Sequence, residues 1–336
     1  MRSAALRVLG ATAALVLASA VPAVAVADDQ GPDRDFTIED PRITESSGLA
    51  ASRAHPGVYW THNDQDAPLI YGVDSRTGRT VATLTMKGVG TPRDMEGISV
   101  GPDGDIYVGD IGDNLDGSWD HVWIYRFPEP EQLRDQTVRA TQYDVKYADG
   151  ARNAEALMVH PKTGRVYIAS KNQKGGGLYE GPERLSTTRT NVFRRVGEVP
   201  WVTDGAFSPA GDRLVLRGYF AADEYAWKNG RLADDGTAVA APFQGQAESV
   251  TYTPDGSAFM FGSEGKQSRV IRVDREGVTP SPGTTGPGAP APTGPGGTGA
   301  SGESNESKGN ATVGVLVLGA AAALFVGFRR LVRRRR

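Results

Sequence analysis

Apolar residues along the chain gather in short runs that are separated by turns, and this pattern repeats. Each repeat starts with a polar residue, then a small residue and an apolar run, as in Asp94-Met95-Glu96-Gly97-Ile98. A turn such as Pro102-Asp103-Gly104 follows, and after it a second run such as Ile106-Tyr107-Val108. Short runs bounded by Pro and Gly are typical of β-strands joined by hairpins. Because we find no convincing amphipathic helix among them, the pattern predicts an all-β fold.

The repeats occur at a nearly constant spacing. The residues that head the successive apolar runs are Ser47, Glu96, Glu155, Asp204 and Glu248. They lie 49, 59, 49 and 44 residues apart, which is the length of a four-stranded propeller blade. The five repeats therefore predict a five-bladed β-propeller. The last repeat ends after its third strand, and residues 35–39 can supply the missing outer strand and close the ring. Residues 113–153 are long enough for a sixth blade, so six blades remain an alternative.

The composition changes along the chain and divides it into parts. These are a signal peptide (1–27), an N-terminal segment with the closing strand (28–41), the propeller (42–275), a linker (276–310), a transmembrane helix (311–328) and a basic tail (329–336). The signal ends in Ala25-Val26-Ala27, a small-x-small cleavage site. The linker is rich in Gly, Pro, Ser and Thr and cannot bury a core. The apolar stretch before the arginines just spans a bilayer, so we expect an extracellular propeller and a cytoplasmic C-terminus.

Charge and cysteine content narrow the function. The chain has no cysteine, so its exported fold must be stabilised by its core and not by disulfides. The formal net charge is −3, but eight of the 37 Lys and Arg residues lie in the signal and the tail. The remaining part has 29 basic against 40 acidic residues, a net charge near −11. This balance argues against nucleic acid as a partner and suits the binding of cations. We expect a monomer.

The repeated acids should lie together at one mouth of the propeller. The first strand of each blade lines the central channel, and in an antiparallel meander its start lies beside the end of the second strand. The predicted carboxylates at this mouth are those of Glu96, Glu155, Asp204 and Glu248. The residues that end or follow the second strands should face the same mouth, and they include His62, Asp64, Asp110, Lys171, Arg217 and Glu264.

Several carboxylates in a narrow channel repel one another unless positive charge lies among them. Calcium is the natural candidate, since it takes many oxygen ligands in flexible geometry. We therefore predict that the four repeated acids ligate Ca²⁺. Alternatively, Lys171 and Arg217 neutralise the acids themselves or bind an anionic group above them. A purely structural role, in which the acids accept hydrogen bonds from backbone amides, also stays open.

Two further roles follow for residues near this mouth. Asp64 and Glu264 are predicted to contact the ligand together with the two basic residues. Asp110 and His62 are the candidates for orienting water or for acting as a base.

Some of these motifs resemble those of known families. Ser47-Gly48-Leu49-Ala50, Trp60-Thr61-His62-Asn63-Asp64 and Asn153-Ala154-Glu155-Ala156-Leu157 resemble a widespread group of secreted bacterial β-propellers. Asp94-Met95-Glu96-Gly97-Ile98 is similar to the first-strand motif D-x-E-G-[LI] of phytase-like and esterase-like propellers. The resemblance covers about residues 42–273. It implies that Glu96 contributes to calcium binding and that nearby basic residues hold phosphate. The chain departs from true phytases in having five repeats, where they have six blades.

The sequence therefore favours a membrane-anchored extracellular propeller with a cation site that binds a small anionic ligand. In the enzymatic version, a metal-activated water hydrolyses a phosphoester or an ester. The rival hypothesis is a non-catalytic module that binds a protein or a glycan at the cell surface.

Overall fold

The computed structural model describes residues 33–277, except 65, 66, 116 and 234. These residues form strands, turns and loops, which confirms the all-β prediction. The predicted signal peptide, nearly all of the linker, the transmembrane helix and the basic tail lie outside the described residues. Within the described part, no helix is long and apolar enough to cross a membrane.

Most strands pair antiparallel with the strand that follows them, which produces meanders. The first meander consists of β2 (Ser46–Ala51), β3 (Val58–Asn63), β4 (Leu69–Asp74) and β5 (Thr80–Lys87). A short strand, β9 (Gln136–Arg139), adds to its outer edge parallel to β5. Turns with Pro or Gly join the strands, and Gly57 has φ 83°, a conformation that glycine adopts without strain.

The second and third meanders are joined at their outer edges. The second consists of β6 (Met95–Val100), β7 (Asp105–Asp110), β8 (Val122–Pro128) and β10 (Thr141–Tyr147). The third consists of β11 (Ala154–Val159), β12 (Val166–Ser170), β13 (Gly176–Glu180) and β14 (Asn191–Val199). Strands β10 and β14 pair parallel, so one eight-stranded sheet results. The long segment 113–153 thus supplies the two outer strands of the second meander, β8 and β10, and the edge strand β9 of the first.

The fourth and fifth meanders complete the described part. The fourth consists of β15 (Asp204–Phe207), β16 (Arg213–Arg217) and β17 (Ala222–Lys228), with β18 (Arg231–Leu232) and β19 (Thr237–Val239) both paired to β17. The fifth consists of β20 (Ala247–Tyr252), β21 (Ala258–Ser263) and β22 (Arg269–Asp274). Strand β1 (Phe36–Thr37), from the start of the described chain, pairs antiparallel with β22.

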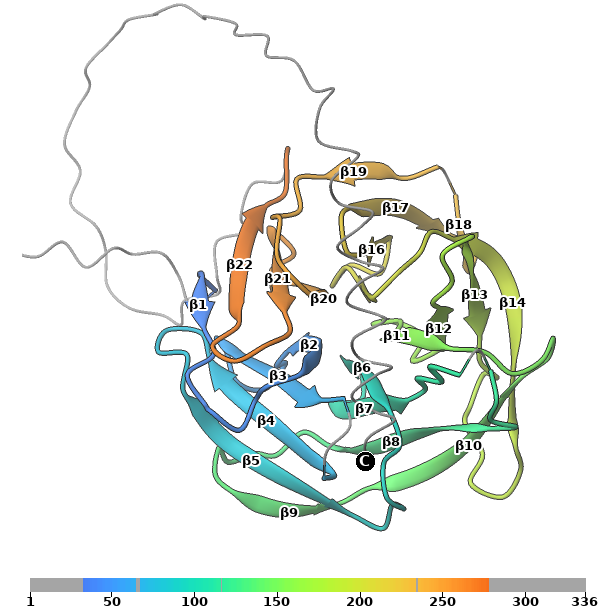
Figure 1. Ribbon diagram of the computed structural model, residues 1–336, viewed down its shortest axis with the longest axis horizontal. Helices are drawn as coiled ribbons and strands as arrows, with labels where there is room; N and C mark the ends of the chain where they lie inside the picture. Colours follow the sequence, from blue (N-terminus) through green and yellow to red (C-terminus); the bar gives the residue numbers. More distant parts are fainter. Residues whose placement is uncertain (1–32, 65–66, 116, 234, 278–336) are drawn as a thin grey trace, which may run out of the picture. The chain divides into compact units, whose positions relative to one another are not determined.

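The first strands of the meanders lie next to one another around a common axis. Figure 1 shows β2, β6, β11 and β20 nearest the middle, with β5, β9, β10 and β14 on the outside. Strand β2 contacts both β6 and β20, and β11 contacts β6 and β15. Strand β15 in turn contacts β20. This arrangement is propeller-like, and it brings the starts of the first strands together.

The core lies between neighbouring meanders. Trp60 of β3 is fully buried in a cluster that also holds Ile98 of β6 and Tyr125 of β8. Its ring leaves no room for a side chain at Gly72, where a Cβ atom would lie 2.7 Å from the indole. The indole nitrogen donates a hydrogen bond of 2.6 Å to Glu129. Large side chains packed in this way fix each meander against the next.

Candidate functional site

The residue that heads the first strand lies at a β-bulge in four of the five repeats. The pairing register shifts at Ser47, Glu96, Glu155 and Glu248, so none of these residues lies directly opposite a partner on the second strand. A bulge re-aims a side chain out of the normal alternation of a strand. The three glutamates are at most 5% exposed. The repeated acids are therefore placed by a repeated backbone irregularity.

The fourth repeat differs, because its register is regular. Asp204 lies directly opposite Arg217, and both residues are 1% exposed. Asp204 accepts a hydrogen bond of 2.9 Å from the backbone N–H of Val250 in the next meander. Burial raises the pKa of Asp204 well above its usual value, although its backbone hydrogen bonds and Arg217 oppose this shift. Asp204 therefore connects two meanders.

Arg217 is bound to backbone carbonyls in the interior. Its Nη1 donates to the carbonyl oxygens of Ser249 and Gly262, both at 2.6 Å, and its Nη2 donates to Gln244 at 2.8 Å. Burial lowers the pKa of Arg217 to about 10, partly offset by Glu248 and Asp204. An anion at this guanidinium would have to displace internal hydrogen bonds.

Asp110 holds the loop that leads into β6. Its carboxylate accepts hydrogen bonds from the backbone N–H groups of Arg93 and Asp94 and from the Tyr125 hydroxyl, the last at 2.6 Å. Asn63 has the equivalent role in the first meander, where its Oδ1 accepts from two backbone N–H groups at 3.0 Å. The last residue of the second strand therefore fixes backbone in both meanders.

His62 is fully buried beside β2 and β6. A Cβ atom at Gly48 would lie 3.0 Å from both His62 Nε2 and the Ile98 side chain, so the imidazole is tightly enclosed. Burial lowers the pKa of His62 to about 4, which keeps the ring neutral at pH 7. Its Nε2 has no hydrogen-bond partner among the described residues.

Two carboxylate triads share Asp64 and lie near the starts of β2, β6 and β20. One consists of Glu45, Asp64 and Glu264, and the other of Asp64, Asp94 and Glu96. In each triad, one oxygen per residue lies within 4.8 Å of the others. Burial raises the pKa of Glu96 well above its usual value, and the negative charges of Glu155, Asp94 and Asp64 add to this shift. We call these five residues the acid cluster.

A second group of acids surrounds a lysine. Lys171 Nζ lies 3.0 Å from Glu155 Oε1 and donates a hydrogen bond of 2.9 Å to the Tyr219 hydroxyl. Burial alone would lower the pKa of Lys171, but Glu155, Glu248 and Tyr219 raise it well above its usual value. Burial raises the pKa of Glu248 to about 8, against the opposing effect of Lys171. We call Glu155, Lys171, Tyr219 and Glu248 the lysine cluster.

The structure thus divides the predicted site residues. It brings Glu96, Asp64 and Glu264 into the acid cluster, and Glu155, Glu248 and Lys171 into the lysine cluster. The other four predicted residues are engaged by, or enclosed within, the interior: His62, Asp110, Asp204 and Arg217.

Sequence reasoning missed two members of the acid cluster, Glu45 and Asp94. Both stand two positions before the bulged residue, and Asn153 and Gln246 occupy this position in other repeats. Asn153 donates to Glu155 at 3.3 Å, and Gln246 donates to Glu264. A comparison of this position across the repeats is the signal that would have identified them.

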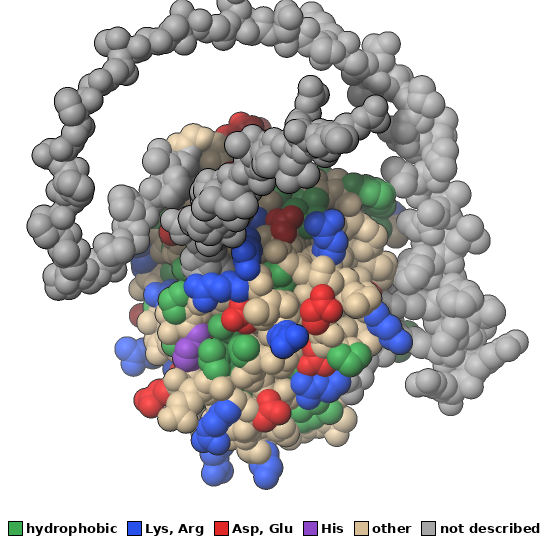
Figure 2. Space-filling view, turned by 90° about the vertical axis from the view of Figure 1, so that its left-hand side faces the viewer, with side chains coloured by type: hydrophobic (Ala, Val, Ile, Leu, Met, Phe, Trp, Pro, Cys, Tyr) green, Lys and Arg blue, Asp and Glu red, His purple; other side chains and the backbone are tan. Residues whose placement is uncertain are grey.

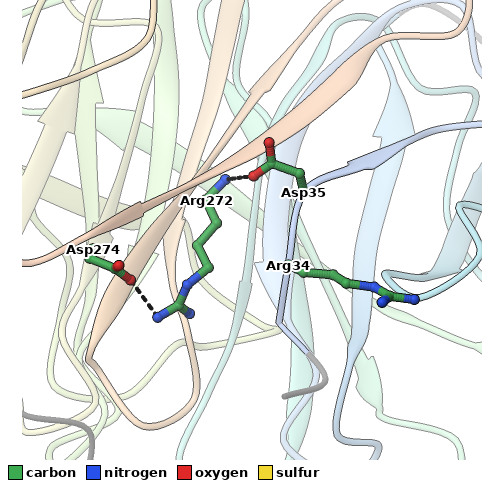
Figure 3. A pocket seen from close by; sticks show the side chains of 4 residues that line it. All are labelled: Arg34, Asp35, Arg272 and Asp274. Atoms are coloured by element: carbon green, nitrogen blue, oxygen red, sulfur yellow. Dashed lines mark hydrogen bonds and ion pairs between the residues drawn. The ribbon is translucent and has the colours of Figure 1, made fainter. Parts of the chain in front are cut away.

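A pocket of about 370 Å³ lies elsewhere, at the edge formed by β1 and β22. Its lining comprises Arg34, Asp35, Arg272 and Asp274 (Figure 3). The Arg272 guanidinium pairs with Asp274 at 2.6 Å, and its backbone N–H donates to Asp35 at 2.8 Å. None of these residues occupies a repeated position. Figure 2 shows charges of both signs intermixed over the described part of one side of the molecule. Mixed charges of this kind produce no strong electric field that would steer a charged partner.

Comparisons with known proteins assign no family. No protein-family model matches the chain, and no curated protein matches it. Among solved structures, it is similar to the PQQ-bound aldose sugar dehydrogenase of Streptomyces coelicolor, with 14% identity and a TM-score of 0.42 over 73% of this chain and 99% of that one. It is also similar to hydrazine synthase of Kuenenia stuttgartiensis (14%, TM-score 0.36, 66% and 56% of the two chains). A third similar structure is that of an auxiliary nutrient binding protein from Bacteroides ovatus. Its sequence identity is 14% and its TM-score 0.40, over 68% of this chain and 57% of that one.

Proposed function

We propose that the protein is a membrane-anchored extracellular propeller that binds Ca²⁺ through its acid cluster and, with that ion, a small anionic ligand. The observation that carries this proposal is the position of Asp64, which belongs to both carboxylate triads. One side chain thereby connects five acids from three different meanders.

The proposed architecture is a closed ring of five blades. Each meander supplies one blade, and β1 completes the last one beside β22. The contacts of β2 with both β6 and β20 support closure, because they join the first blade to the second and to the fifth. Membrane anchoring rests on the apolar residues 311–328 and the arginines that follow them.

The geometry of the acid cluster suits calcium. Ca²⁺ binds oxygens at about 2.4 Å, so two ligands on opposite sides of the ion are about 4.8 Å apart. The oxygens of each triad lie within this span. Mg²⁺ needs shorter distances, about 2.1 Å, and a regular octahedron. We propose that Asp64, Asp94 and Glu96 hold the ion and that Glu45 and Glu264 complete its shell.

The anionic ligand would lie between the ion and Lys171. The raised pKa of Lys171 keeps its ammonium protonated at physiological pH. Two of its three N–H groups are accounted for by Glu155 and Tyr219, which leaves one for a ligand oxygen. Glu96 connects the two clusters, because Asp64 and Asp94 raise its pKa while Lys171 lowers it.

Ligand binding is favoured over hydrolysis. Hydrolysis by metal-activated water requires a group within reach that accepts the water's proton. Asp110 already accepts hydrogen bonds from two backbone N–H groups and a tyrosine. His62 is enclosed between strands and fully buried. Neither predicted base is placed to perform this step.

Calorimetric titration of the metal-free full-length protein with Ca²⁺ tests the proposal. We expect the wild type to bind calcium and to melt at a higher temperature with it, and we expect Asp64→Asn to lose both effects. Asp274→Asn is the matched control, because its side chain is 79% exposed and lies in β22. The proposal fails if the wild type takes up no calcium at millimolar concentration, or if Asp64→Asn binds it equally well.

A further inference from the structure

A second pocket, of about 180 Å³, lies where β8 begins and β10 ends. Trp119, His121 and Tyr147 contribute rings to its lining, and Asp120 and Lys146 contribute charges. Val122 of β8 pairs with Val145 of β10, which holds these residues on adjacent strands. The lining shares no residue with the acid cluster or the lysine cluster.

The tryptophan of this pocket is held in place by its neighbours. The Arg93 guanidinium lies 4.1 Å from the ring centre of Trp119 and 3.7 Å from that of Trp123. Arg93 also donates a hydrogen bond of 2.9 Å to the carbonyl of His121. The backbone N–H of Trp119 donates to Asp113 at 2.7 Å. A ring fixed in this way loses little conformational freedom when a ligand packs against it.

Tyr147 lines the pocket and carries a buried hydroxyl. The residue is 7% exposed, and its ring packs against Tyr179 at 5.0 Å between centres. The hydroxyl has no hydrogen-bond partner among the described residues. A buried hydroxyl without a partner is unfavourable, so a ligand whose oxygen reaches it gains a hydrogen bond.

The charges at the rim balance one another. Asp120 lies 2.6 Å from His121 Nδ1 and 3.5 Å from Lys146 Nζ. Because these opposite charges neutralise one another, the rim offers hydrogen-bond donors and acceptors without favouring a charged ligand. The volume also limits the ligand. A cavity of about 150 Å³ holds one benzene ring, whereas drug-sized ligands occupy about 300 Å³ or more.

We propose that this pocket binds a single uncharged sugar ring, with one face of the pyranose against Trp119 and a hydroxyl bound to Tyr147. Aromatic rings contact the C–H face of a sugar, and the polar rim meets its hydroxyls. The other hydroxyls interact with Asp120 and Lys146. The site does not depend on the proposed cation site, because the two have no residue in common.

Saturation-transfer NMR on the full-length protein tests the proposal, in a detergent without a sugar headgroup. The probes are the methyl glycosides of glucose, galactose, mannose and N-acetylglucosamine. A ligand of this size should bind with a dissociation constant on the order of 1 mM. We expect at least one probe to receive saturation, and Trp119→Ala to weaken its binding about tenfold.

Two further variants keep the test decisive. Tyr147→Phe removes only a hydroxyl without a partner, so it should fold and yet weaken the sugar about threefold or more. Trp201→Ala, which removes a tryptophan from a different loop, should bind like the wild type. The proposal is overturned if no probe receives saturation at millimolar concentration, or if folded Trp119→Ala and Tyr147→Phe bind as the wild type does.

Discussion

The acid cluster and the lysine cluster are two versions of the same repeated arrangement. Glu96 and Glu155 both occupy the bulge at the start of a first strand, and both are buried. Glu155 has an ammonium 3.0 Å away, while Glu96 has Asp64 and Asp94 as neighbours. Equivalent backbone therefore leads to a different local charge, nearly balanced around Glu155 and strongly negative around Glu96.

The difference arises one residue beyond the second strand. Asp64 follows Asn63 at the end of β3, and Lys171 follows Ser170 at the end of β12. These positions are equivalent in their own repeats, although Asp64 comes from the repeat before that of Glu96 and Lys171 from the repeat of Glu155 itself. A carboxylate at one and an ammonium at the other set the local charge. The comparison suggests that the lysine cluster is neutralised by the protein itself and that the acid cluster is built for a cation from solution.

Of the predicted substitutions, replacement of Lys171 should lower the stability of the fold most. Lys171→Met leaves Glu155 and Glu248 buried together without their cation. Breaking a buried ion pair by removing one partner costs about 3–5 kcal/mol. We expect the free energy of unfolding in urea to fall by this amount, while Lys174→Met, at an exposed position in the next turn, should change it little. A loss below about 1 kcal/mol would show that the lysine cluster does not need its lysine.

Converting one cluster into the other is the most direct test of the comparison. Asp64→Lys places an ammonium where the third repeat has Lys171. In the wild type, calcium at about 100 times its dissociation constant should stabilise the fold by about 2.7 kcal/mol. We expect thermal unfolding of Asp64→Lys to show no calcium dependence. If calcium still raises the melting temperature of this variant, Asp64 is not a shared ligand.

The pH dependence of stability should contain a contribution from Glu248 of the lysine cluster, beside those of Glu96 and Asp204. The folded pKa of Glu248 is raised from 4.5 to about 8, so its contribution to stability is complete below pH 4.5 and is lost as the pH rises through 8. His62 acts oppositely, but only between about pH 4 and 6.5. Between pH 6.5 and 8, metal-free protein should therefore lose at most about 1.4 kcal/mol per pH unit from Glu248.

The variant Glu248→Gln, which resembles the protonated acid, should flatten this decline. Glu131→Gln, at an exposed position, is its control and should leave the slope unchanged. Urea unfolding at several pH values in the presence of a chelator measures this slope, the change in unfolding free energy per pH unit, for both variants. If wild type and Glu248→Gln have the same slope, the raised pKa of Glu248 is contradicted.

The comparison of the two clusters also shows which features can be predicted from the sequence. Apolar runs and Pro-Gly turns identify the all-β fold, because strand length and hairpin chemistry are local properties. The bulges are not visible in the sequence, since they depend on how two strands pair. A shift of one residue decides whether a side chain faces the mouth or the interior. Asp110, the last residue of its strand, therefore binds backbone, whereas Asp64, one position beyond its strand, joins the acid cluster.

The substitution with the smallest expected effect on stability is the one that best distinguishes the two clusters. Tyr219→Phe removes the hydroxyl that accepts a hydrogen bond from Lys171 and lies beside Glu248. A typical hydrogen bond contributes about 1 kcal/mol to stability, and urea unfolding should show a loss of this size. Tyr219 belongs to the lysine cluster alone, so the calcium affinity measured by calorimetry should stay within about twofold of the wild type. A large loss of calcium affinity would mean that the two clusters act as one site, because a hydroxyl on the lysine side would then control a cation held by Asp64.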